Sequence, residues 1–573
     1  MRRLVRFLAP FKKQMILGPL FKLTEAVLEL LIPLMMMRVI DDGVMKGDTA
    51  YIWRMGGSML AVSVVGFGCA LLCQYYASLA AQGVGTNLRN EAFGHINRLS
   101  FAELDRFGTP TLINRVTADI NQLQWAVAML IRLVLRAPFL CVGGFLMALW
   151  IDAELSLLIL AVILVFGLIL YLSTARAVPL FRRVQQKLDA LSRVLRENLS
   201  GVRVIRAFAR VKGENERFSK ASDAHADASV AVSRVAALVN PLTSLIMNAG
   251  ILLLLYFGAV RVNSNTLTTG EVIALINYVI DILAAMLVVA NLVSVFTKAA
   301  ASAARVNELF DTQPSVADGP GASPSPDAPL LRFEAVSFRY GDAAADALEN
   351  ISFTLNKGET LGIIGGTGAG KSTLANLICR FYDATEGRVL LCGEDIKNYA
   401  LSSLRKYIGV VPQKSVLFSG TLRENLLYGN AEAADGALFE ALRAAQAEFV
   451  LKLPEGLDTK VLQGGVNFSG GQKQRLCIAR ALVQKPALLI LDDSSSALDY
   501  MTEAALRREL NRIGDMAVVQ ITQRAASILH AGRILVLEDG AVAGLGTHAE
   551  LKKNCPLYRE ILKSQELAGE ESA

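Results

Sequence analysis

Cysteine and histidine are scarce in this 573-residue chain, which contains seven cysteines and four histidines. The cysteines are scattered and form no pair of CxxC units, so neither a zinc site nor a disulfide framework is supported. The formal net charge is only +6, and the basic residues are not gathered into one tract, which argues against a nucleic-acid partner. The opening "MRRLVRFLAPFKKQ" lacks a short apolar core followed by a small-residue cleavage site, so we interpret it as a helix on a membrane surface.

Apolar residues are abundant instead, at 53% of the chain with a mean hydropathy of +0.40. Six stretches are long enough to cross a bilayer, which takes roughly 20 helical residues, and they lie at 15–38, 54–80, 127–150, 155–176, 236–260 and 272–296. The long connections 81–126 and 177–235 are rich in arginine, whereas the short ones carry aspartate and glutamate. Basic residues favour the cytoplasmic side. We therefore expect both termini and the long connections in the cytoplasm, the latter as helical extensions with a short turn at each tip.

A change of composition divides the chain. Residues 311–330, "DTQPSVADGPGASPSPDAPL", have the Pro, Gly and Ser content of a linker. Beyond them, short apolar strands alternate with helical stretches, which is typical of an α/β domain. The predicted organisation is a membrane α-helical bundle over 1–310, a linker over 311–330 and an α/β P-loop NTPase domain over 331–573.

A phosphate-binding motif opens this second domain. The stretch "GGTGAGKST" fits GxxxxGK[ST] and lies between a predicted strand and a predicted helix. Its glycines let backbone N–H groups face a phosphate, Lys371 would neutralise the outer phosphates of ATP, and Ser372 would bind Mg²⁺. Asp492, at the end of the apolar run "ALLILD", is the expected second Mg²⁺ contact. The predicted ATP-binding residues of the motif are Gly365, Gly366, Thr367, Gly368, Ala369, Gly370, Lys371, Ser372 and Thr373.

The stretch "NFSGGQKQR" completes a pattern that resembles the ATP-binding cassette (ABC) family, because the P-loop, SGGQ and "LLILDD" follow in that family's order. The resemblance implies that Tyr340 stacks on adenine, that Gln413 contacts Mg²⁺ and that Asp499 belongs to the D-loop. It also implies an exporter-type half-transporter that works as a dimer. Each ATP would lie between one P-loop and the partner's signature residues, here Ser469, Gly470, Gly471 and Gln472. The segments 103–120 and 196–210 resemble the two loops that contact the cassettes.

Two positions depart from the family's pattern. Asp493 stands where a catalytic glutamate is usual, and Gln523 stands where a switch histidine is usual. The shorter carboxylate and the missing imidazole predict slow hydrolysis at this chain's own P-loop. The pair resembles the degenerate-site subunit of bacterial heterodimeric multidrug exporters, which implies a second half-transporter with an intact glutamate and histidine. A homodimer with two slow sites, or an aspartate that still works after backbone adjustment, is the alternative.

Charged residues interrupt the predicted spans. They are Glu25 and Glu29 in the first, Arg132 and Arg136 in the third, and Asp281 in the sixth. Charges within a membrane usually face the bundle interior or a water-filled cavity. These residues would therefore line a substrate cavity, or else pair with one another between spans.

The expected function is ATP- and Mg²⁺-dependent export of drugs or other small amphipathic compounds through a cell membrane, in contact with its lipids. A lipid or peptide exporter, a siderophore-type importer and an ATP-gated channel or regulatory subunit are the alternatives.

Overall fold

A computed structural model describes residues 2–570 apart from 323–324, 326–327, 342 and 495–497. The chain forms two compact units. One contains Met1–Ile96 and Pro110–Asp311, and the other contains Asn97–Thr109 and Thr312–Ala573. We describe each unit by itself.

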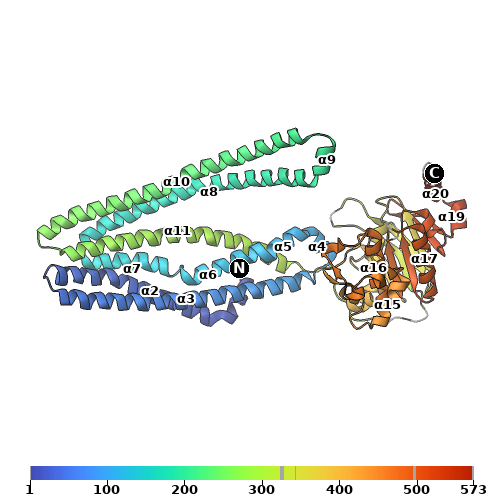
Figure 1. Cartoon of the computed structure of the whole chain (residues 1–573), viewed down its shortest axis with the longest axis horizontal. Coiled ribbons are helices and arrows are strands. Elements are labelled where there is room, and N and C mark those ends of the chain that lie inside the picture. Colours follow the sequence, from blue (N-terminus) through green and yellow to red (C-terminus); the bar gives the residue numbers. More distant parts are fainter. Residues whose placement is uncertain (1, 323–324, 326–327, 342, 495–497, 571–573) are drawn as a thin grey trace. The chain divides into compact units, whose positions relative to one another are not determined.

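Long helices build the first unit, and α8 packs along α10 while α2 packs along α3 (Figure 1). The long helices are α2 (Lys12–Arg38), α3 (Thr49–Ile96), α8 (Ala153–Ser200), α10 (Val211–Asn263) and α11 (Thr269–Asp311). The shorter ones are α1 (Arg2–Val5), η1 (Arg6–Phe11), η2 (Val39–Val44), α5 (Thr109–Asn114), η3 (Arg115–Asp119), α6 (Ile120–Arg132), α7 (Arg136–Ile151) and α9 (Val202–Ala207). Helices of 43 to 53 residues are about 65–80 Å long, roughly twice the thickness of a bilayer core. Helices α3, α8 and α10 run past the predicted spans into the long connections, which are helical there as predicted.

Among the described residues, five helical segments are long and apolar enough to cross a membrane. They begin at Thr49, Thr109, Ala153, Val211 and Thr269. The first predicted span, 15–38, lies in α2, which has 27 residues and therefore sufficient length. Lys22, Glu25 and Glu29 reduce its apolar character, which explains why α2 does not belong to that group.

The third predicted span, 127–150, is not one regular helix. Helix α6 ends at Arg132 and α7 begins at Arg136, with turn residues between them. Pro138 provides a physical reason, because a proline has no N–H group and its ring clashes with the carbonyl four residues earlier, at Val134.

The second unit contains a six-stranded sheet in the order β12-β11-β3-β10-β9-β6. Its strands are β12 (Ala541–Gly546), β11 (Arg533–Glu538), β3 (Thr360–Gly365), β10 (Ala517–Ile521), β9 (Leu488–Asp492) and β6 (Ile408–Val411). All neighbours are parallel except β11 and β12. A four-stranded sheet has the order β2-β1-β4-β5, with β2 (Leu348–Leu355), β1 (Leu331–Phe338), β4 (Glu386–Leu391) and β5 (Glu394–Asp395). A two-stranded sheet pairs β7 (Gly420–Thr421) with β8 (Lys460–Val461).

Helices surround these sheets. They are α12 (Lys371–Ile378), α13 (Leu401–Tyr407), α14 (Leu422–Leu427), α15 (Asp435–Ala444), α16 (Gly470–Val483), α17 (Tyr500–Arg512), α18 (Ala525–Ile528), α19 (His548–Asn554) and α20 (Pro556–Glu570), with the short turns η4 (Ile396–Asn398), η5 (Glu448–Lys452), η6 (Gly456–Asp458) and η7 (Gln463–Gly465). One apolar core joins the two larger sheets through residues such as Phe333 and Ile363. A second core, around Leu442 and Leu482, joins α14–α17 to β9.

Helix α4 (Phe101–Phe107) also belongs to the α/β unit. The ring of Phe101 lies 4.3 Å from that of Phe381, measured between centroids. The Tyr382 hydroxyl donates a hydrogen bond of 2.5 Å to Asp105. Both the burial of Tyr382 and this bond raise the pKa of its phenol. Helix α4, which overlaps the predicted contact segment 103–120, is therefore attached to the α/β unit.

Candidate nucleotide site

The carboxyl ends of three neighbouring parallel strands bring the predicted site together. Strand β10 lies between β3 and β9. The P-loop follows β3, Asp492 ends β9, and Gln523 follows β10. Ligands of open parallel sheets bind at this edge, beyond the carboxyl ends of the strands.

Glycine shapes the loop after β3. Gly368 and Gly370 have φ values of +86° and +91°, which side-chain-bearing residues rarely adopt. A Cβ atom on Gly370 would lie 2.7 Å from the carbonyl oxygen of Ala347. The loop therefore needs glycine at Gly370 for both its conformation and its packing, and α12 begins at the next residue, Lys371.

A cavity of about 350 Å³ lies over this loop. Eleven predicted site residues line it, namely Tyr340, Thr367, Gly368, Gly370, Lys371, Ser372, Thr373, Gln413, Asp492, Asp493 and Gln523. Ala347, Ile521 and Thr522 also line the cavity. These three residues were not predicted from the sequence, because they belong to no recognised motif. The folding of the chain around the sheet places them at the cavity. Gly365, Gly366 and Ala369 do not belong to the lining set, and Ala369 is buried.

Lys371 lies buried beneath the loop. Its Nζ donates hydrogen bonds to the carbonyl oxygens of Gly365, at 2.9 Å, and Gly366, at 2.5 Å. Burial lowers the pKa of the ammonium group, while the charges of Asp492 and Asp493 oppose that shift. A bound polyphosphate would supply further negative charge next to this ammonium group.

Three oxygen-bearing side chains provide a place for Mg²⁺. The Ser372 hydroxyl lies 3.3 Å from Asp492 Oδ1, and Gln413 lines the same cavity. Burial raises the pKa of the Asp492 carboxyl, and the neighbouring Asp493 raises it further. Mg²⁺ prefers oxygen ligands and commonly uses one or two carboxylates together with substrate phosphates. This donor set fits Mg²⁺ bound together with ATP.

Tyr340 stands at the edge of the cavity. Its ring makes edge contacts with Phe338, at 4.7 Å, and Tyr382, at 5.2 Å, between centroids. Its hydroxyl donates to Thr373 Oγ1 at 3.2 Å, and 37% of the residue is exposed. These contacts hold the ring at the cavity, where an aromatic side chain can stack on a planar base.

The main chain of Asp493 has an uncommon conformation that hydrogen bonds hold in place. Its φ is +46°, in the left-handed region. Its N–H group donates to the Ile521 carbonyl at 2.9 Å, and its own carbonyl accepts from Gln474 Nε2 at 3.4 Å. Gln523 lines the cavity from the end of the adjacent strand β10. Of the described residues that line the cavity, none is a glutamate or a histidine.

The predicted signature lies outside this cavity. Ser469 caps α16, since its hydroxyl accepts from the Gln472 N–H and the Gln472 side chain accepts from the Ser469 N–H. Ser469 and Gly470 are exposed, while Gly471 and Gln472 are half-buried. Asp499 caps α17 by accepting from the Thr502 N–H at 2.9 Å. Part of the predicted D-loop, residues 496–497, lies outside the described residues.

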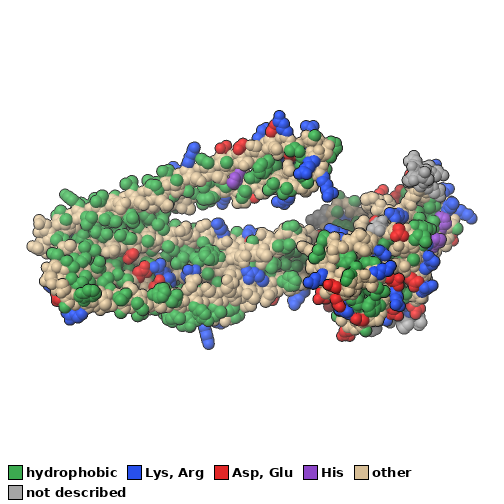
Figure 2. All heavy atoms as spheres, in the orientation of Figure 1, with side chains coloured by type: hydrophobic (Ala, Val, Ile, Leu, Met, Phe, Trp, Pro, Cys, Tyr) green, Lys and Arg blue, Asp and Glu red, His purple; other side chains and the backbone are tan. Residues whose placement is uncertain are grey.

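In the helical unit, charged side chains gather within an otherwise apolar face (Figure 2). Glu29 on α2 forms an ion pair of 2.6 Å with Arg136 on α7. Glu25 pairs at 2.7 Å with Lys22, one turn away on the same helix. Arg132 ends α6, and Asp281 lies on α11 next to Tyr278, whose hydroxyl donates to the Leu30 carbonyl. The expected pairing between spans therefore occurs for Glu29 and Arg136.

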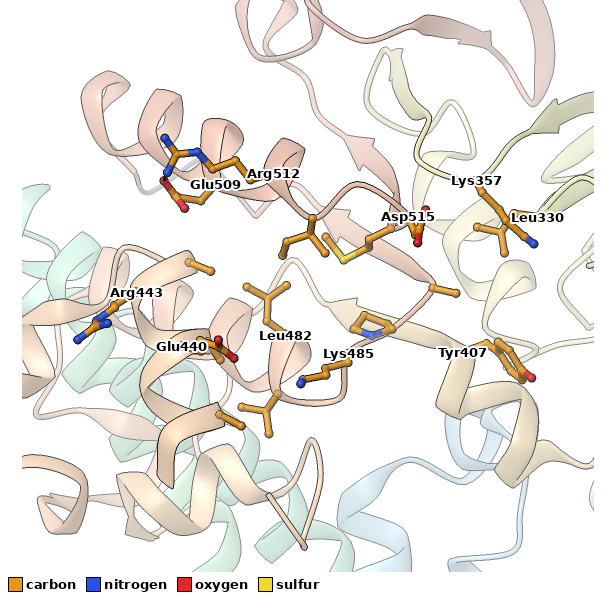
Figure 3. Close-up of a pocket in the computed structure, with 18 of the residues that line it drawn as sticks. Leu330, Lys357, Tyr407, Glu440, Arg443, Leu482, Lys485, Glu509, Arg512 and Asp515 are labelled. Carbon is orange, nitrogen blue, oxygen red and sulfur yellow. Dashed lines mark hydrogen bonds and ion pairs between the residues drawn. The ribbon is translucent and has the colours of Figure 1, made fainter. Parts of the chain in front are cut away.

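A larger cavity, of about 1060 Å³, lies at the opposite edge of the six-stranded sheet (Figure 3). Ala487 and Met516, which immediately precede β9 and β10, line it. Charged side chains from α15 and α17, including Glu440 and Arg512, surround it (Figure 3). None of the described residues that line it belongs to the nucleotide motifs, so size alone does not identify the nucleotide site.

Two family models match the chain. The one described as ABC transporter transmembrane region covers residues 15–286, and the one described as ABC transporter covers residues 348–496.

Curated relatives match nearly the full chain. An uncharacterized ABC transporter ATP-binding protein of Mycobacterium tuberculosis is 38% identical over 98% of this chain and 97% of its own length. The ATP-dependent lipid A-core flippase of Chromohalobacter salexigens is 35% identical over 98% of this chain and 97% of its own length. A multidrug efflux ATP-binding/permease protein of M. tuberculosis is 34% identical over 98% of this chain, which covers 47% of that longer protein.

A solved structure shares the fold. The structure of a bacterial Atm1-family ABC exporter with ATP bound matches with a TM-score of 0.78 over 98% of both chains, at 25% identity.

Proposed function

Because this chain belongs to the ABC transporter family, as an exporter-type half-transporter with transport ATPase activity, we propose that it is the slow-site subunit of a heterodimeric exporter. The chain binds ATP and Mg²⁺ at the cavity described above. Most hydrolysis takes place at the partner's P-loop, which this chain's Ser469 and Gly470 complete.

The observation that carries this proposal is that Asp493 and Gln523 line the same cavity as Lys371 and Asp492. An aspartate reaches about 1.5 Å less far than a glutamate, the length of one C–C bond. A misplacement of about 1 Å can reduce a rate roughly 100-fold. The main chain of Asp493 is bonded on both sides, to Ile521 and Gln474, which opposes a compensating backbone shift.

Gln523 adds a second limitation. Its amide can donate a hydrogen bond to the γ-phosphate of ATP but lacks the acid–base chemistry of imidazole. Two weakened groups beside a complete phosphate-binding loop favour a site that retains ATP over one that cleaves it quickly.

The transport cycle follows from these parts. ATP binding closes the two cassettes, and α4, held by Phe101 and Asp105, transmits that closure to the membrane helices. Hydrolysis at the partner's P-loop resets the cycle. Both termini face the cytoplasm in this scheme, in agreement with the arginine-rich long helices.

We propose small amphipathic compounds as substrates, with a preference for cations. The pairs Glu29–Arg136 and Glu25–Lys22 are each neutral. Asp281 on α11 adds a carboxylate that interacts electrostatically with the Glu29–Arg136 pair, and we expect this carboxylate to attract a cationic substrate group. Lipid export is the second candidate, favoured by the similarity to a protein named as a lipid A-core flippase.

Purification of the tagged full-length chain from its native membrane tests the heterodimer. We expect a second half-transporter to copurify, with glutamate and histidine at the positions equivalent to Asp493 and Gln523. A complex of two copies of this chain with rapid ATPase activity that Asp493→Asn abolishes would contradict the proposal.

Substitutions in the purified complex test the division of labour between the sites. Ser469→Ala or Gly470→Ala should reduce ATPase activity at least about tenfold, because the partner's site loses its signature contacts. Asp493→Asn should change it less than about twofold. The double change Asp493→Glu with Gln523→His should raise turnover at this chain's site, measured in a complex whose partner lacks its own catalytic glutamate. The opposite order of the first two effects would refute the assignment.

A further inference from the structure

The short helix α18 begins without a cap of its own. The residue before it, Arg524, forms no capping hydrogen bond with its side chain. The first N–H group of the helix, that of Ala525, donates instead to Gln565 Oε1 at 2.7 Å. Because unpaired N–H groups at a helix start require a partner, a residue forty positions later fulfils this role.

The side chain of Gln565 also bonds the main chain of Gln523. Gln565 Nε2 donates to the carbonyl oxygen of Gln523 at 2.7 Å. One amide group thus holds the main chain at Gln523 and at Ala525. Upstream, the Thr522 N–H donates to the Ile363 carbonyl at 3.1 Å, so the segment is fixed from β3 on one side and from α20 on the other.

The first two turns of α20 pack against the α/β unit. Tyr558 is fully buried, and its hydroxyl lies 2.8 Å from His548 Nδ1. Tyr558 shares an apolar core with Ile528 of α18 and with Ile364, the residue before Gly365. The C-terminal helix therefore shares one apolar core with the strand that leads into the P-loop and with α18, and Gln565 bonds the segment that carries Gln523.

We infer that Gln565 is a positioning residue that aims Gln523 at the outer phosphate and so sets this site's preference for ATP over ADP. This inference rests on the proposed contact between Gln523 and the γ-phosphate. Because ADP lacks that phosphate, displacing Gln523 should weaken ATP binding selectively, whereas a general loss of structure should weaken both nucleotides.

The amide of Gln565 suits this position because it donates through Nε2 and accepts through Oε1 at once. Gln565→Ala removes both bonds. In Gln565→Glu, the ionised carboxylate can still accept the hydrogen bond from the Ala525 N–H. It has no donor for the Gln523 carbonyl oxygen and repels that oxygen electrostatically. A protonated carboxyl group would restore the donor.

Photolabelling of the full-length chain by an azido-ATP probe, with ATP or ADP as competitor, tests the inference at this chain's own site. For Gln565→Ala we expect the ATP concentration for half-competition to rise about fivefold, the value of one hydrogen bond. The ADP value should change less than about twofold. Lys563→Ala, at an exposed position two residues away, is the matched control and should leave both values unchanged.

Gln523→Ala separates this inference from the proposed function. It should reproduce the loss of ATP preference, and the double variant with Gln565→Ala should show no further loss, because the two residues act through one contact. If Gln523→Ala alters the preference and Gln565→Ala does not, the positioning role is wrong while the role of Gln523 stands. If Gln523→Ala leaves the preference unchanged, the proposed phosphate contact fails.

The pH dependence of Gln565→Glu offers a second measurement, independent of any folding defect in the alanine variant. Relative to the unmodified chain, its ATP preference should recover as the pH falls and the carboxyl group becomes protonated. A ratio between variant and unmodified chain that stays constant with pH would overturn the inference.

Discussion

Single residues set the shape of the nucleotide cavity, and Gly370 is the clearest case. Its φ of +91° costs a residue with a Cβ atom about 1–2 kcal/mol, and a methyl group there would meet the Ala347 carbonyl. Gly370→Ala should therefore reduce azido-ATP labelling at least about tenfold and lower the thermal unfolding midpoint. Gly436→Ala is the matched control, since a Cβ atom there has no neighbour within 4 Å, and equal labelling of both variants would contradict this explanation.

The raised pKa of Asp492 predicts how Mg²⁺-dependent ATP binding varies with pH. A carboxyl group must be ionised to bind Mg²⁺, and burial raises the pKa of Asp492 above its ordinary value of 3.8. A raised pKa favours the protonated form in the folded protein. Mg²⁺-dependent ATP binding should therefore weaken as the pH falls through this raised pKa and strengthen as it rises. Asp492→Asn should remove both the Mg²⁺ dependence and this pH dependence, as titration of azido-ATP labelling with Mg²⁺ at several pH values would determine.

The individual site residues were largely predictable from the sequence. Lys371, Ser372, Asp492, Asp493 and Gln523 carry motif signals, and all of them line one cavity. The contribution of Gln565 was not predictable, because its contacts with Gln523 and Ala525 depend on tertiary packing across some forty residues and leave no local pattern.

At the scale of secondary-structure elements, helix α4 joins the α/β unit through a few contacts. Tyr382→Phe removes the hydrogen bond to Asp105, which contributes about 1 kcal/mol. Substrate-stimulated ATPase activity of the complex should fall severalfold, while basal activity changes little, because the nucleotide contacts remain. Tyr428→Phe removes a hydroxyl from an exposed tyrosine and is the control. Equal stimulation in both variants would exclude α4 as the main transmitter.

Hydropathy located the long apolar helices well but missed their internal interruption. The break between Arg132 and Arg136 falls in an apolar stretch, where hydropathy is insensitive to backbone geometry, and Pro138 was the available signal. In α2, charged residues lower the mean hydropathy, although the helix is long enough to span a bilayer.

At the scale of the whole transporter, the carboxylate of Asp281 predicts selectivity for cationic substrates. Asp281→Asn should reduce export of a cationic amphipathic dye about fivefold to tenfold, which corresponds to roughly 1 kcal/mol of lost charge attraction. Export of a neutral dye of similar size should not change. Dye transport in inverted vesicles measures both rates, and Asp223→Asn, on an exposed part of α10, is the control. Equal losses for the two dyes would exclude a charge-selective role.

Helix α16 links the two nucleotide sites of the proposed dimer. In the proposed dimer, Ser469 at the start of this helix would face a nucleotide held by the other subunit. Less than two turns later, Gln474 bonds the main chain of Asp493, which lines the nucleotide cavity of its own subunit. A rigid rod of this kind cannot shift at one end and stay still at the other. Occupancy at one site should thus be sensed mechanically at the other, and an ATP that is seldom cleaved would still regulate the pace at which its neighbour is consumed.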